Sequence, residues 1–138
     1  AAEASEEYVR LLYFYGRNLG MAFQITDDVL DMTADPELLG KPIGSDLRQG
    51  VITLPAIHAL KTCSRKNKLA SLLIKRDKTS AEIKEIIELI QDCGGIEYAL
   101  QLAERYLSRA RHQAEFLPEG KARETLIGLT YFVKTRGF

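Results

Sequence analysis

The sequence lacks an excess of charge of either sign. Its 138 residues carry 19 basic and 19 acidic side chains, so the formal net charge is zero. A neutral chain gives no support for nucleic-acid binding or for attraction to a charged membrane surface. No apolar run approaches the length of a transmembrane segment, and the N-terminus lacks the basic and apolar regions of a signal peptide. We therefore expect a cytoplasmic protein without a transmembrane segment.

Cysteine is scarce, which limits metal and disulfide chemistry. The two cysteines, Cys63 and Cys93, are far apart in the sequence, and neither lies in a metal-binding cysteine motif. We expect both to be reduced thiols, as is usual in the cytosol.

No strand pattern, internal repeat or low-complexity tract is present, whereas apolar residues recur at helical spacing along most of the chain. The sequence predicts one all-α domain, a helical bundle over residues 1–138. The expected helices cover residues 5–32, 54–63, 64–74, 80–93, 96–117 and 122–135, with a short helical turn after Asp35-Pro36. We expect a loop over residues 40–47, and Ile57 and Leu129 among the buried residues.

Local signals mark several helix ends. Thr79 and Glu82 form a capping-box pattern, and Thr53 precedes Pro55 as a helix cap. Gly16 and Gly20 lie four residues apart on one helix face, a spacing that usually admits a close backbone neighbour. His58 is interpreted as a packed residue rather than a ligand.

Three carboxylates stand at the end of an otherwise apolar helix. Asp27 and Asp31 are four residues apart and share a face, and Asp28 lies beside them. Like charges at this spacing disfavour the helix unless a cation compensates, and hard oxygen ligands favour Mg²⁺ or Ca²⁺. A solvated helix end is the alternative. An EF-hand fits poorly, because Val29 takes the place of its third ligand.

A loop with two glycines and a proline, residues 40–47, follows this helix and brings Lys41 near the carboxylates. Lys41 would neutralise them or bind a phosphate that the metal also binds. Gln24 lies one turn before Asp27, where it would contact a substrate or form hydrogen bonds in the core.

Together these blocks resemble a known family. The run from Phe23 to Asp31, followed by Gly40 to Leu47 and by Thr53-Leu54-Pro55, closely resembles the second aspartate-rich motif of the trans-polyprenyl diphosphate synthases. The C-terminal residues 122–138 are also similar to the end of a member of that family. The likeness covers the whole chain, but only as the C-terminal half of such an enzyme.

The resemblance implies a prenyltransferase of the isoprenoid synthase fold. Such enzymes condense isopentenyl diphosphate with an allylic diphosphate, with Mg²⁺ as cofactor, to make precursors of quinone side chains and other isoprenoids. It implies that Asp27 is a metal ligand supported by Asp28 and Asp31, directly or through water. Lys41 would contact the allylic diphosphate, and Phe23 and Gln24 would line the substrate site.

Two departures from the family pattern stand out. Val51 occupies a position where some members carry a second lysine, and the first aspartate-rich motif is absent. The chain would therefore be a fragment that needs the missing N-terminal half and that assembles as a homodimer or heterodimer. The alternatives are a non-catalytic helical subunit of a heteromeric synthase and a terpene cyclase-like enzyme.

Overall fold

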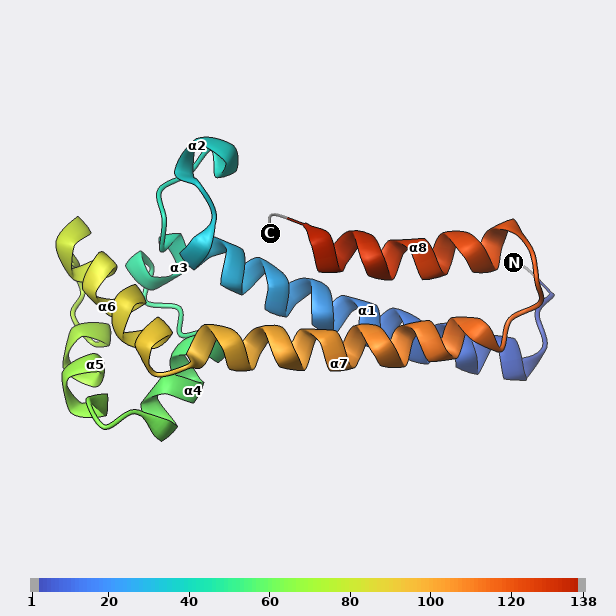
Figure 1. Cartoon of the computed structure of the whole chain (residues 1–138), viewed down its shortest axis with the longest axis horizontal. Helices are drawn as coiled ribbons and strands as arrows, with labels where there is room; N and C mark the ends of the chain where they lie inside the picture. Colours follow the sequence, from blue (N-terminus) through green and yellow to red (C-terminus); the bar gives the residue numbers. More distant parts are fainter. Residues whose placement is uncertain (1–2, 137–138) are drawn as a thin grey trace. The chain divides into compact units, whose positions relative to one another are not determined.

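In a computed structural model of the chain, every regular element between residues 3 and 136 is a helix (Figure 1). These are the residues that the structure describes, apart from the side chains of residues 38 and 39. The helices are α1 (Glu6–Thr33), α2 (Pro36–Leu39), α3 (Ser45–Arg48), α4 (Leu54–Thr62), α5 (Lys66–Leu73), α6 (Ser80–Asp92), α7 (Gly95–Glu115) and α8 (Lys121–Thr135). The predicted all-α fold is confirmed. None of these helices is both long and apolar enough to cross a membrane.

Local capping signals account for most of the helix ends. The capping box at the start of α6 is confirmed, since Thr79 and Glu82 exchange both of its hydrogen bonds. Thr53 occupies the expected N-cap of α4, but its Oγ1 is buried without a hydrogen-bond partner among the described residues. The predicted irregular loop is only partly correct, because Ser45–Arg48 form the helical turn α3.

The chain divides into two compact units, and the first comprises residues 3–26 and 102–136 of the described chain. Within it α8 runs antiparallel to α7 (Figure 1), since Lys134 near the end of α8 lies 3.2 Å from Glu104 and Thr130 accepts from Arg111, further along α7, at 3.4 Å. Arg111 Nη2 also donates to Glu104 within α7, at 2.5 Å. Burial alone would raise the pKa of Glu104, but the hydrogen bonds from Arg111 and Lys134 outweigh it, and the pKa is lowered. The Tyr15 hydroxyl donates to the Leu126 carbonyl at 2.7 Å and joins α1 to α8.

The second unit comprises residues 27–101 and carries the acidic motif. Helices α4, α5 and α6 pack together around a core that also includes Met32 of α1 and Leu47 of α3. Its remaining buried members are Ala56, Ala59, Leu69, Leu73, Ile83, Ile86, Leu89 and Ile90. Gly95 lets α7 begin against α4, because a Cβ there would stand 2.3 Å from the Pro55 carbonyl oxygen.

Three packing predictions are wrong. No atom lies within 4 Å of the Cβ positions of Gly16 and Gly20, so within the described chain these glycines do not admit a close neighbour. Ile57 is 40% exposed, because Ala56 and Ala59 occupy the buried face of α4 and Ile57 projects from another. Leu129 is 41% exposed on α8.

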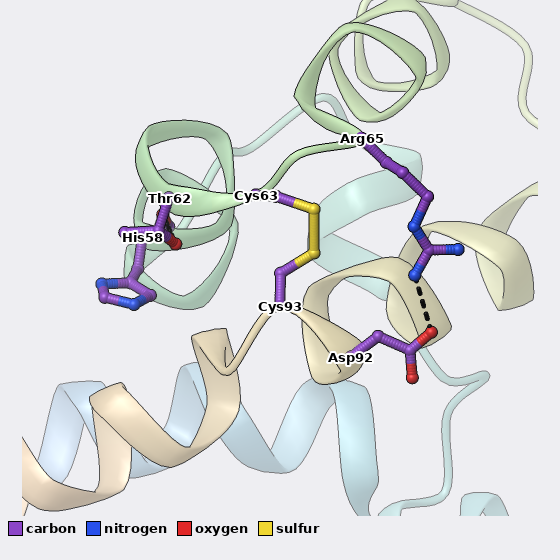
Figure 2. The surroundings of a disulfide bond; sticks show 6 residues. All are labelled: His58, Thr62, Cys63, Arg65, Asp92 and Cys93. Carbon is purple, nitrogen blue, oxygen red and sulfur yellow. Dashed lines mark hydrogen bonds and ion pairs between the residues drawn. A yellow bond between two sulfur atoms is a disulfide. The ribbon is translucent and has the colours of Figure 1, made fainter.

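The cysteines also differ from expectation, since Cys63 and Cys93 form a disulfide (Figure 2). Their Cα atoms are 5.2 Å apart although 30 residues separate them in sequence. Cys63 ends α4 and Cys93 ends α6, so the packing of these helices brings the two thiols together. An ion pair between Arg65 and Asp92, at 2.8 Å, lies beside the bond (Figure 2). The prediction of two reduced thiols is therefore wrong.

Candidate functional site

The last two turns of α1 present the three aspartates to different environments. Asp27 is exposed, Asp28 is half-buried, and Asp31 is only 2% exposed. Val29 and Leu30 between them are buried, and Met32 of the same helix end belongs to the core of the second unit. Asp27 and Asp28 therefore lie where a metal ion could approach them, whereas Asp31 is enclosed by the protein.

Asp31 is engaged by the segment that follows the helix. Its Oδ2 accepts a hydrogen bond from the Asp46 backbone N–H at 3.1 Å, and its backbone carbonyl accepts one from the Gly44 N–H at 2.7 Å. Its Oδ1 lies 2.9 Å from Lys41 Nζ in an ion pair, although the angle is not that of a directed hydrogen bond. Three contacts from one residue thus connect α1 to residues 41–46.

Lys41 supplies a positive charge at the edge of this cluster. Its side chain is 47% exposed, so the ammonium group remains accessible from solvent. Contact with the Asp31 carboxylate raises the pKa of Lys41, with help from the charges of Asp31 and Asp46 and against the smaller effect of desolvation. Lys41 is therefore protonated at neutral pH, and the prediction that the loop brings it near the carboxylates is confirmed.

The loop of residues 40–47 packs closely against α6 at Gly44. Gly44 has φ +71°, which favours glycine, and a Cβ at this position would stand 2.6 Å from Ile83 Cγ2. The chain can therefore pass this close to α6 only with glycine at this position. Close packing against a buried isoleucine limits how far the loop that carries Lys41 can move.

Phe23 and Gln24 belong to the first unit and precede the aspartates along α1. The Phe23 ring is 40% exposed and carries the Arg136 guanidinium 4.1 Å from its centroid. Gln24 is exposed, which excludes the alternative of a core residue. Their predicted role in the substrate site stays a prediction.

Two residues that contact predicted site residues were not predicted from the sequence. Asp46 contributes its backbone N–H to Asp31 and its charge to Lys41. Asp46 lies two residues after Gly44, and this position at the start of a helical turn could have indicated that its backbone N–H needs an acceptor. Arg136 contacts Phe23 across more than a hundred residues of sequence, and nothing local indicates that contact.

The described residues do not form a metal site from protein side chains alone. Among residues 3–136, no group of three acidic, histidine or cysteine side chains could hold a metal ion. His58 stacks on the Tyr98 ring with centroids 4.0 Å apart, which confirms that it is a packed residue. A metal at Asp27 would therefore need ligands from water or from a bound molecule.

The geometry defines an all-helical protein that presents a protonated lysine next to a carboxylate at the end of a long helix. The sequence matches the polyprenyl synthetase family over residues 1–90. The chain belongs to this family, and the family resemblance drawn from its motifs is confirmed.

Individual relatives agree with this assignment. The chain is 40% identical over its whole length to heptaprenyl diphosphate synthase component 2 of Bacillus subtilis, and it covers 39% of that protein. It is 35% identical over 136 residues to octaprenyl diphosphate synthase of Escherichia coli, covering 98% of this chain and 42% of the relative. The chain thus spans about two fifths of the length of the relatives it matches.

A solved structure shows the same fold. A polyprenyl synthase from Caulobacter crescentus, crystallised with calcium and isoprenyl diphosphate, aligns with a TM-score of 0.89 at 33% identity. The alignment covers 99% of this chain and 42% of that one. The predicted isoprenoid synthase fold is therefore confirmed for the aligned residues of this chain.

Proposed function

We propose that this chain is the part of a trans-polyprenyl diphosphate synthase that holds the leaving diphosphate of the allylic substrate. The observation that carries the proposal is the contact between Asp31 and Lys41, which joins the acidic end of α1 to the loop that carries Lys41. A metal-bound diphosphate contains a cation, which carboxylates would bind, and an anion, which a lysine would bind. The family membership supports this reading.

Mg²⁺ fits the donor set of this site. Magnesium is usually held by one or two carboxylates and completes its octahedron with waters and substrate phosphate oxygens, so a closed protein cage is not required. Asp27 is the proposed ligand, and Asp28 supports it directly or through water. Asp31 is enclosed by the protein, so its proposed support for the metal site is indirect, through its contacts with Asp46 and Lys41. The calcium and isoprenyl diphosphate of the Caulobacter crescentus structure support an oxygen-ligand site for a divalent cation. Bound Mg²⁺ would supply positive charge that stabilises the departing diphosphate.

The proposed reaction is elongation of a prenyl chain. The bond between the allylic carbon and its diphosphate oxygen breaks, and both electrons leave with the pyrophosphate. The double bond of isopentenyl diphosphate attacks the allylic cation, and loss of a proton restores a double bond. In this chain Lys41 would bind the leaving diphosphate, and Phe23 and Gln24 would line the allylic site.

The remaining parts of the active site would come from protein outside this chain. Such protein would also cover the exposed apolar side chains on the N-terminal part of α1, which include Val9, Leu12 and Tyr13 at 56%, 42% and 64% exposure. The word "component" in the name of the Bacillus subtilis relative supports assembly with a different subunit. A homodimer is the alternative assembly.

A chimeric enzyme tests the proposed function. Residues 1–138 replace the matching 42% of the Escherichia coli octaprenyl diphosphate synthase, and incorporation of labelled isopentenyl diphosphate into prenyl diphosphates is measured. We expect Mg²⁺-dependent activity from the chimera and none from residues 1–138 alone. A folded chimera without activity, or turnover by the chain alone, would contradict the proposal.

A further inference from the structure

We propose that Asp31 is a positioning residue, which clasps residues 41–46 and acts on the allylic diphosphate through Lys41. The inference rests on the proposed function, and it assigns to Asp31 a task different from that of Asp27. Asp27 is exposed, whereas Asp31 is 2% exposed and both its carboxylate oxygens already face groups of this chain. An enclosed carboxylate with these partners is suited to fixing a loop.

One half of the clasp is a helix cap that comes from a residue distant in sequence. The first N–H groups of a helix lack partners within it, and an N-cap side chain usually accepts a hydrogen bond from one of them. The N-cap of α3 is Gly44, which has no side chain to do so. Asp31 Oδ2 takes that place and accepts the Asp46 N–H at 3.1 Å. The start of α3 is therefore capped by α1.

The other half of the clasp is the ion pair with Lys41. A lysine ammonium has three N–H donors, and the contact with Asp31 occupies one side of it. The Lys41 side chain is 47% exposed, so its other donors remain available to an anion from solvent. The clasp can therefore hold Lys41 in place while Lys41 binds a diphosphate. The Gly44 N–H bond to the Asp31 carbonyl, at 2.7 Å, closes the loop independently of the carboxylate.

Amide hydrogen exchange on residues 1–138 tests the clasp without any activity measurement. Asp31→Ala should speed exchange of the Asp46 amide roughly tenfold or more, the range for a hydrogen bond to a charged group. Asp31→Asn, which keeps an acceptor oxygen, should change it much less. Asp77→Asn removes the same charge from an exposed position and serves as the control. Unchanged Asp46 exchange in folded Asp31→Ala would overturn the proposal.

Kinetics of the chimera separate positioning from metal binding. Asp31→Asn should raise KM for the allylic diphosphate about tenfold and leave the Mg²⁺ concentration for half-maximal rate unchanged. In a Lys41→Ala background the same substitution should add little, because Asp31 acts through Lys41. A shifted Mg²⁺ requirement with unchanged KM, or a lower KM, would overturn the positioning role. An inactive parent chimera would contradict the proposed function, while the exchange measurement would still decide the clasp.

Discussion

Loss of the disulfide should lower the stability of the chain by a calculable amount. The bond between Cys63 and Cys93 closes a loop with a sequence separation of 30 residues that contains α5 and α6. Loop-closure entropy for this length gives about 3–4 kcal/mol at 25 °C. For a chain of this size that corresponds to a fall in melting temperature of roughly 10 °C. The value is an upper limit, because residual structure in the reduced, unfolded chain leaves less conformational entropy for the bond to remove.

Thermal melting followed by circular dichroism, with and without a reductant, measures this effect. Cys93→Ser is the matched variant, since Cys93 is only half-buried and the replacement hydroxyl can reach water. The variant should melt near the reduced wild-type temperature and should not respond to reductant. Complete alkylation of both cysteines in the folded, unreduced protein would show that the disulfide does not form. Equal melting temperatures in the two conditions would show that it does not stabilise the fold.

Three further predictions concern other parts of the chain. In the chimera, Lys41→Ala should raise KM for the allylic diphosphate more than KM for isopentenyl diphosphate, and equal effects in steady-state kinetics would return Lys41 to a structural role. Glu104→Gln should destabilise the chain at pH 7 by up to about 1 kcal/mol, a small value because the carboxylate is 37% exposed. Since the folded pKa of Glu104 is lowered, its contribution is complete above the ordinary value of 4.5 and is lost as pH falls below it. The difference in unfolding free energy between wild type and variant, measured with urea, should therefore decrease at acid pH. Finally, residues 1–138 should self-associate through the apolar part of α1, and replacing Leu12 and Tyr13 by lysine should shift sedimentation toward the monomer. Ile74→Lys, at an 80% exposed site outside that surface, should not.

Local features were predictable from the sequence because their causes are local. The α6 capping box depends on Thr79 and Glu82, three residues apart, and the helix period of α1 places Asp27 and Asp31 on one face. The nearness of Lys41 also followed from its sequence position, since a short turn of chain separates it from α1. Such features need no knowledge of the tertiary packing.

Contacts between distant residues could not be predicted in the same way. The disulfide between Cys63 and Cys93 depends on how α4 and α6 pack, which no local pattern encodes. The exposure of Ile57 has the same origin, because small alanines rather than the larger isoleucine occupy the buried face of α4. The cap that Asp31 provides for α3 could not be predicted, because it depends on residues 41–46 folding back onto the end of α1.

In the proposed function, Asp27 at the acidic end of α1 holds the cation that stabilises the departing allylic diphosphate. Steady-state rates of the chimera at saturating Mg²⁺ test it most directly, with Asp27→Ala compared against Asp77→Ala at an exposed site of the same unit. We expect Asp27→Ala to lower kcat about a hundredfold or more with unchanged helix content, and Asp77→Ala to retain the parent rate. A near-normal rate for a folded Asp27→Ala chimera would contradict it.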